Sequence, residues 1–217
     1  MCPKALTAEF IGTFALIFIG AGTGALASSL VAVALAHGLV ILTFALAYGR
    51  LSGAHFNPAV TIGLWLGRVI KAPVAAAYIV VQLAAGIIAA AILNYALGSS
   101  AGTLGATTLA EGIPPLSGAI IEGILTFFLV SVIFSTAVSG KSGNLAPIAI
   151  GLTLAGAILM GGSVTGASLN PARTIGPAVI TGTYSNIWVY IVGPILGGMV
   201  AAILYTFFLK SAEEPAV

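Results

Sequence analysis

The sequence predicts an all-α membrane protein in which six transmembrane helices and two re-entrant half-helices form an inverted internal repeat. The first supporting observation is composition: 59% of the 217 residues are apolar and only 6% are Asp, Glu, Lys or Arg, whereas soluble domains carry about 25% charged residues. The second is a set of six long apolar stretches, and the third is a short polar motif that occurs twice. We expect one transmembrane domain over 1–217, with repeats at approximately 5–96 and 118–209.

Composition also excludes several classes of protein. So few charged side chains cannot cover a water-facing surface, which excludes a soluble enzyme, and a net charge of +2 is too small to indicate a nucleic-acid partner. Cys2 is the single cysteine, so the chain has no intrachain disulfide and no thiolate metal cluster. With two histidines and no aspartate, we expect neither a metal site nor a cofactor.

Six apolar stretches account for the transmembrane helices, since a helix needs about 20 mostly apolar residues to cross the hydrocarbon core. They cover approximately 5–27, 31–49, 74–96, 118–138, 145–162 and 186–209. The first stretch follows Lys4 and could be mistaken for a signal peptide. It is too long for the apolar region of one, however, and five further spans follow it. We therefore interpret it as a retained helix.

The basic residues predict the orientation of the spans, because cytoplasmic loops carry an excess of Lys and Arg. Six of them fall at positions that six spans place on one side of the membrane: Lys4, Arg50, Arg68, Lys71, Lys141 and Lys210. Both termini are therefore expected in the cytoplasm, and the short chain with minimal tails favours a prokaryotic cell membrane. Arg173 is the single basic residue on the other side, and this exception calls for a specific reason.

A repeat covers nearly the whole chain. The segment SGAHFNPAVTIG, with its asparagine at Asn57, recurs as TGASLNPARTIG, with its asparagine at Asn170, at an offset of 113 residues. Glu9 and Glu122 have the same offset. Each copy contains three spans, an odd number, so the copies must insert in opposite orientations. Inverted repeats of this kind place a site at their interface near the bilayer midplane.

The Asn-Pro-Ala motif is a favourable start for a helix, because asparagine is a good N-cap and proline fits the first helical position. The apolar segments at 57–67 and 170–180 would each reach about 16 Å, half the hydrocarbon core. We therefore predict two half-helices that enter from opposite faces and meet at the centre. The motif residues are Asn57, Pro58, Ala59, Asn170, Pro171 and Ala172.

The segments that lead into these half-helices are not helical, and such backbone exists at that depth only where it lines a water-filled path. Two positive helix ends, each worth about half an elementary charge, would repel hydronium and metal cations there. If each asparagine oxygen caps its own helix, both amide NH₂ groups are left to donate to water in the lumen. A pore of this kind passes small neutral molecules and excludes ions.

With its paired segments SGAHFNPAVT and TGASLNPAR, the chain resembles the aquaporins of the major intrinsic protein family along essentially its whole length. The resemblance implies a passive channel for water and other small neutral solutes, without enzyme activity, and a homotetramer in the lipid bilayer with one pore per protomer. The mixed water and glycerol signature is similar to that of archaeal or bacterial members.

The resemblance also implies a narrow filter on the extracellular side, built from His37, Ile158, Ala167 and Arg173. His37 and Ile158 lie near the outer ends of their predicted spans, and Arg173 lies about one turn outward from the midplane. The four residues are therefore expected at one level, which also explains the single outward arginine. This set is similar to that of plant vacuolar members, some of which pass ammonia and urea.

The filter leaves an alternative substrate open, namely ammonia, or glycerol and urea, as the main solute. Strict water channels of the family carry phenylalanine where His37 stands and histidine where Ile158 stands. Glycerol facilitators follow the arginine with aspartate, whereas this chain has Thr174.

The remaining ionisable residues receive roles from the same resemblance. His55 is expected in the cytoplasmic vestibule. Glu9 and Glu122 lie within spans, where acids are normally functional, but we expect them to be structural and to accept backbone N–H groups from the re-entrant loops. An intramembrane enzyme would need a catalytic triad, for which no aspartate exists, and a coupled transporter would need one of these glutamates to titrate on the pathway.

Overall fold

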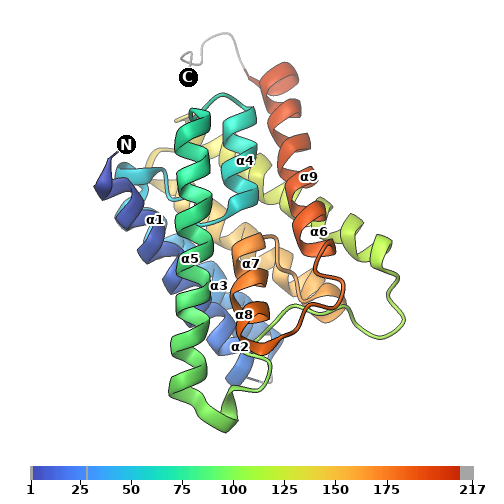
Figure 1. The fold of residues 1–217 in the computed structure, drawn as a ribbon. Coiled ribbons are helices and arrows are strands. Elements are labelled where there is room, and N and C mark those ends of the chain that lie inside the picture. The colour runs from blue at the N-terminus through green and yellow to red at the C-terminus, as the bar shows by residue number, and fades with distance from the viewer. Residues whose placement is uncertain (1, 28, 211–217) are drawn as a thin grey trace.

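The computed structural model describes residues 2–27 and 29–210. The predicted domain over 1–217 therefore includes residues outside the described part, namely 1, 28 and 211–217. Within the described part every regular element is a helix (Figure 1). Six helical segments there are long and apolar enough to cross a membrane, which confirms the predicted spans: Pro3–Leu26, Leu30–Ser52, Ala72–Leu97, Pro115–Val138, Gly143–Thr165 and Val189–Leu209.

The first span combines α1 (Pro3–Ala15), a π-helical segment (Leu16–Ala21) and α2 (Gly22–Leu26). The other five are built on α3 (Leu30–Ser52), α5 (Ala72–Leu97), α6 (Pro115–Ile133), α7 (Ala146–Thr165) and α9 (Val189–Leu204). Further π-helical segments extend α6 over Phe134–Val138 and α9 over Tyr205–Leu209. Sequence does not predict these segments, because apolar composition defines a span but not the spacing of its backbone hydrogen bonds.

Two spans end later than predicted, and for the same reason. The helices predicted over 31–49 and 145–162 continue to Ser52 and Thr165. In each case the next residue is a glycine with left-handed φ, 88° at the first site and 83° at the second. A glycine in this conformation directly after a helix is a common way for the helix to end. The two repeats thus end these corresponding helices in the same way.

The predicted half-helices are α4 (Pro58–Leu66) and α8 (Pro171–Thr181), which contain 9 and 11 residues. At about 1.5 Å per residue they measure about 14–16 Å. Figure 1 shows α4 in the upper half of the molecule and α8 in the lower half. The start of α1 and the end of α9 both lie toward the upper end in this view, as an even number of spans requires.

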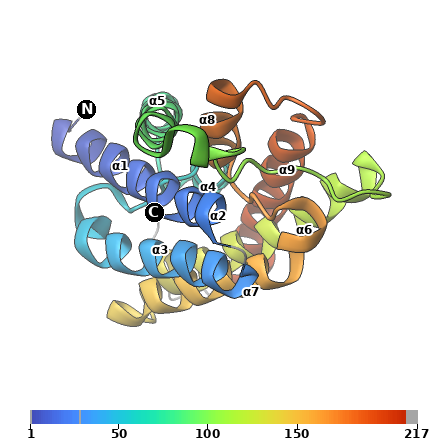
Figure 2. The ribbon, with the colours of Figure 1, turned by 90° about the horizontal axis from the view of Figure 1, so that it is seen from below.

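Each half-helix packs against the last span of the other repeat. Helix α8 lies against α5, and α4 lies against α9. Figure 2 shows α8 between α5 and α9 in a view along the bundle. A Cβ atom on Gly176 of α8 would lie 2.5 Å from the carbonyl oxygen of Gly86, and one on Gly63 of α4 would lie 3.0 Å from that of Gly198. Only glycine permits backbones to approach so closely, so these pairs lock the two repeats together.

Candidate functional site

The segments that lead into α4 and α8 share an unusual backbone. Ala54 and Phe56 have φ angles of 53° and 51°, and Ala167 and Leu169 have φ angles of 43° and 53°. Residues with a Cβ atom rarely adopt this left-handed region, and such conformations persist only where the surrounding structure holds them in place. The repeated sequence therefore encodes the same strained approach twice.

Glu9 of α1 holds the first approach segment. Its fully buried carboxylate accepts hydrogen bonds from the backbone N–H groups of His55 and Phe56, at 2.9 and 2.8 Å. It also accepts from the side chains of Ser52 at 2.7 Å and Gln82 at 2.8 Å. Several donors around one carboxylate satisfy a group that would otherwise be very costly to bury.

Glu122 of α6 holds the second segment in the same way. It accepts from the backbone N–H groups of Ser168 and Leu169, at 2.9 and 2.8 Å, and from the Thr165 hydroxyl at 2.7 Å. In both segments the N–H groups thus point to a buried carboxylate. Ala54 and Leu169, one from each of these segments, line a cavity.

The two motif asparagines connect the repeats. Asn57 Nδ2 donates to the carbonyl oxygen of Leu169 at 2.8 Å, and Asn170 Nδ2 donates to that of Phe56 at 2.9 Å. Their Oδ1 atoms cap α4 and α8. The predicted donation of the two amide NH₂ groups into the lumen is only partly available, because one N–H group of each amide bonds to the opposite repeat. A primary amide carries two N–H groups, so each asparagine keeps one for the cavity that both line.

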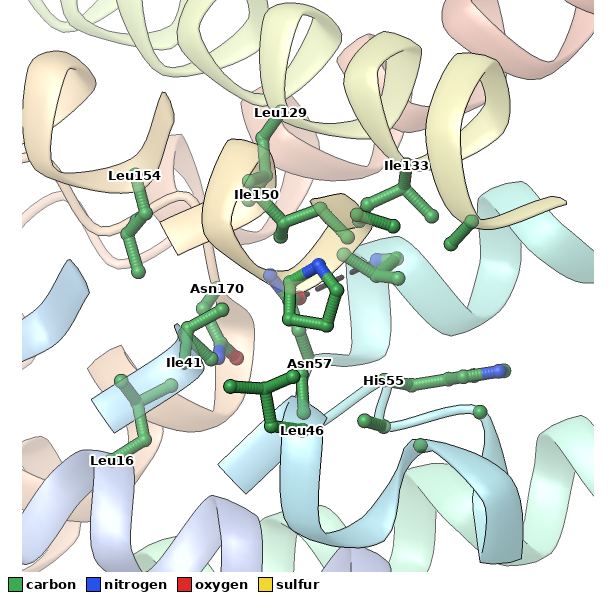
Figure 3. Close-up of a pocket in the computed structure, with 18 of the residues that line it drawn as sticks. Leu16, Ile41, Leu46, His55, Asn57, Leu129, Ile133, Ile150, Leu154 and Asn170 are labelled. Carbon is green, nitrogen blue, oxygen red and sulfur yellow. Dashed lines mark hydrogen bonds between the residues drawn. The ribbon is translucent and has the colours of Figure 1, made fainter. Parts of the chain in front are cut away.

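The cavity has a volume of about 360 Å³ and is lined by residues of both approach segments. It extends from His37 and Arg173 at one end, past the two asparagines, to Arg50 and Asn144 at the other. Figure 3 shows apolar side chains around Asn57 and Asn170, which come from four different spans: Leu16, Ile41, Leu129, Ile133, Ile150 and Leu154. The wall is therefore apolar, with polar groups gathered at separate levels.

His37 and Arg173 form the polar outer end of the cavity. His37 Nδ1 lies 2.8 Å from the carbonyl oxygen of Val33. Because a carbonyl can only accept, Nδ1 carries the proton and Nε2 of the neutral ring presents a lone pair. Arg173 is only 4% exposed and donates from Nη1 to the carbonyl oxygen of Gly105 at 2.6 Å. Among the described residues, His37 Nε2 and Arg173 Nε are buried and have no hydrogen-bond partner, so this end of the cavity contains an unsatisfied acceptor and an unsatisfied donor.

Ile158 and Ala167, the other two predicted filter residues, are buried and do not line this cavity. Ile158 lies one helical turn beyond Leu154, the outermost lining residue of α7, and on the same face of that helix. Ala167 directly precedes Ser168, which does line the cavity. The structure thus brings His37 and Arg173 to the cavity and leaves the other two beside its outer end.

His55 lines the cavity and is held by a polar network. Its Nδ1 lies 3.1 Å from the Thr61 hydroxyl, and its ring meets Tyr78 edge to face at 5.1 Å. Thr61 donates its one hydroxyl hydrogen to the carbonyl oxygen of Asn57, so it accepts from His55, which places the imidazole proton on Nδ1. Gln82 donates to Thr61 at 3.0 Å and thereby joins this network to Glu9.

Several residues of the site are not indicated by the sequence alone. Gln82, which has no polar counterpart in the second repeat, bridges Thr61 and Glu9. Thr61 could have been found, because the repeat contains it again as Thr174. Gly105 could not, because the segment that contains it has no motif and no counterpart in the other repeat. No group of three His, Cys, Asp or Glu side chains in the described residues could hold a metal ion.

Gly20 gives the His37 ring its space, and this leads to a prediction. A Cβ atom on Gly20 would lie 2.6–2.8 Å from three atoms of the imidazole, so the ring would have to move. We expect Gly20→Ala to push His37 into the cavity and to lower solute flux about tenfold, a typical cost of overpacking. Stopped-flow light scattering on proteoliposomes measures that flux. Gly156→Ala is the matched control, because its Cβ would meet nothing within 4 Å; equal flux in the two variants would contradict the prediction.

The chain is similar to known proteins in both sequence and fold. The sequence matches the family described as major intrinsic protein over residues 2–205. It is 41% identical over 216 residues to aquaporin TIP1-2 of Zea mays, covering 93% of this chain and 84% of that protein. It is 38% identical over 226 residues to aquaporin TIP1-1 of Arabidopsis thaliana, covering 97% and 89%. Among solved structures, the aquaglyceroporin from Plasmodium falciparum has a similar fold, with a TM-score of 0.84, 25% identity and coverage of 95% of this chain and 96% of that chain.

Proposed function

This chain belongs to the major intrinsic protein family, and from that premise we propose that its cavity of about 360 Å³ is part of the pore. Membership in this family of channels makes the chain an integral membrane channel for water and small neutral solutes rather than an enzyme.

The observation that carries the proposal is the pair of asparagines on the cavity wall. Each keeps one N–H group for the lumen, and each sits at the N-terminal end of a half-helix, where the helix dipole is positive. A water molecule between them accepts from both amides, so its own hydrogens point along the cavity. It cannot then accept a hydrogen from the next water in the file. Because proton relay through a water file needs that step, the arrangement conducts water without conducting protons.

We propose that His37, Ile158, Ala167 and Arg173 form the selectivity filter at the outer end. The guanidinium of Arg173 would repel cations and donate to a passing solute, and the free lone pair of His37 would accept from it. Ile158 and Ala167 would supply the apolar sides. A neutral solute that both donates and accepts could exchange its hydration for these contacts, whereas an ion could not.

The other polar residues serve the pore indirectly in this proposal. His55 would form part of the cytoplasmic vestibule, since it lines the cavity on the same wall as Asn57. Glu9 and Glu122 would be structural, because their carboxylates accept hydrogen bonds from the two approach segments and not from a solute.

The assembly and location of the channel also belong to the proposal. We expect a homotetramer with both termini on the cytoplasmic side, on which the basic residues gather. The relatives named above are plant proteins, and they do not support the expectation of a prokaryotic cell membrane.

The test is flux through proteoliposomes, with empty liposomes as the reference. Osmotic shrinkage measures water, re-swelling measures glycerol, and internal alkalinisation measures ammonia. We expect fast water flow without proton leak. A water rate equal to that of empty liposomes, for protein that is folded and correctly inserted, would contradict the proposal.

A channel mainly for ammonia, or for glycerol and urea, is the second candidate, and the lone pair of His37 beside an aliphatic Ile158 favours it. If ammonia or glycerol flux exceeds that of empty liposomes and is lost on His37→Phe with Ile158→His, the filter sets the broader substrate range. Fast water flow with negligible glycerol and ammonia flux would leave water as the main substrate.

A further inference from the structure

Three buried hydroxyl groups form a chain on the outer side of the second motif. Ser168 Oγ lies 2.7 Å from Thr174 Oγ1, which lies 2.8 Å from Thr107 Oγ1. All three residues are at most 4% exposed. Ser168 lies within the second approach segment, Thr174 lies in α8 next to Arg173, and Thr107 belongs to the segment over 98–114 that connects α5 to α6.

The direction of this chain follows from counting hydrogens, because a hydroxyl has only one to donate. Ser168 donates to the carbonyl oxygen of Asn170 at 2.9 Å, so Thr174 must donate to Ser168. Thr107 must then donate to Thr174. The chain therefore runs in one direction, from the 98–114 segment to the asparagine of the second motif.

The first repeat has bonded polar side chains at the same positions, with a different first member and a different last member. His55 and Thr61, at the positions of Ser168 and Thr174, are bonded to each other at 3.1 Å, and Gln82 donates to Thr61 at 3.0 Å. Gln82 is part of a rigid span, α5. Its place in the second repeat is taken by Thr107, which is part of a connecting segment. The second motif therefore receives from that segment a hydrogen bond that the first motif receives from a helix.

Two neighbouring residues of α8 are thus bonded to two positions of the 98–114 segment that lie two residues apart. Arg173 Nη1 donates to the carbonyl oxygen of Gly105 at 2.6 Å, and Thr174 accepts from Thr107. The segment also lies close against the approach backbone, since a Cβ atom on Gly166 would meet Thr107 Cα at 3.1 Å. Further along, Ala110 N–H donates to the carbonyl oxygen of Val164 at 2.9 Å.

We propose that Thr107 and Thr174 are positioning residues that determine the solute selectivity of the outer filter, an inference that rests on the proposed channel function. The hydroxyl bond between them fixes the 98–114 segment in register with α8, so that the Gly105 carbonyl meets the Arg173 guanidinium. Without it the segment keeps its attachment at Ala110, but the carbonyl is no longer held opposite the guanidinium. Arg173 then has more freedom to leave the lumen, and solutes larger than water pass more easily.

The test compares variants that differ by one hydroxyl. Thr107→Val keeps the shape of the side chain and removes its hydrogen bond, whereas Thr107→Ser keeps the hydroxyl. Thr108→Val removes the hydroxyl of the exposed neighbouring residue and is the matched control. Each variant is reconstituted in proteoliposomes, and the permeabilities to water, urea and glycerol are measured by stopped-flow light scattering, with thermal unfolding as a check on folding.

We expect the ratio of glycerol to water permeability to rise about fivefold in Thr107→Val, the factor that corresponds to one net hydrogen bond. Thr107→Ser and Thr108→Val should retain the wild-type ratio. Thr174→Val should also raise the ratio. The ratio of the double variant should not exceed that of the single variants, because both residues act through one contact.

Two results would overturn the proposal. The first is an unchanged ratio in Thr107→Val, and the second is an equal loss of water and glycerol flux, which would indicate a purely structural role. Absence of water flux through the wild-type protein would contradict the proposed channel function itself and overturn this inference with it. The wild-type measurement therefore separates the two failures.

Discussion

Glu9→Ala is expected to lower the thermal unfolding midpoint of the detergent-solubilised protein by about 10 °C and to abolish water flux. The substitution leaves the buried N–H groups of His55 and Phe56 without an acceptor, together with the Gln82 amide. Each unsatisfied buried donor costs about 1–3 kcal/mol. The strained approach segment would lose the contacts that hold it, and Asn57 would leave its position in the cavity.

Two further variants test whether the effect is specific to the buried carboxylate. Glu111→Ala removes an exposed acid outside the spans and should leave both the midpoint and the flux unchanged. Glu9→Gln retains one acceptor oxygen but presents an NH₂ group to a site that contains only donors, so we expect an intermediate loss of stability. A midpoint for Glu9→Ala equal to that of Glu111→Ala would show that the approach segment does not depend on the carboxylate.

Arg173→Val is expected to raise the ratio of glycerol to water permeability about tenfold, the effect of losing one charge-assisted hydrogen bond. Valine is the residue that the first repeat carries at this position, as Val60. The substitution removes the cationic donor at the outer end of the cavity and leaves the Gly105 carbonyl without its partner. We also expect a measurable cation leak, because the repelling charge is lost from the filter.

The measurement uses the three-solute flux assay together with a pH-sensitive dye and a potassium gradient inside the liposomes. Arg68→Asn is the matched control, since it removes an exposed positive charge outside the cavity lining, and asparagine tolerates the left-handed φ of 62° at this position. If Arg173→Val excluded glycerol and cations as well as the control does, the filter would have to lie elsewhere in the pore.

Much of the architecture could be predicted from the sequence, because the signals are local. Six apolar stretches define the spans, and Asn-Pro-Ala defines the start of a helix wherever it occurs. The equal offset of Asn57 from Asn170 and of Glu9 from Glu122 predicts an inverted repeat, and the family comparison and the helical fold agree with it. The predicted ends of α3 and α7 are three residues too early, because these two helices end at a glycine with left-handed φ, and the sequence does not show which glycine adopts it.

Contacts between distant segments could not be predicted in this way. Gln82 lies 73 residues from Glu9, and Gly105 lies 68 residues from Arg173, and neither distance leaves a periodic or repeated pattern. The hydrogen bonds that the asparagine amides donate across the repeats could not be predicted either, since they form only when two loops 112 residues apart meet. The sequence by itself determined the spans, the half-helices and the residues that cap them, because those depend on hydrophobicity and on backbone preferences over a few residues. Only the tertiary structure decided which donors and acceptors remain free to face a solute, because that depends on which of them are already satisfied by partners brought from elsewhere in the chain.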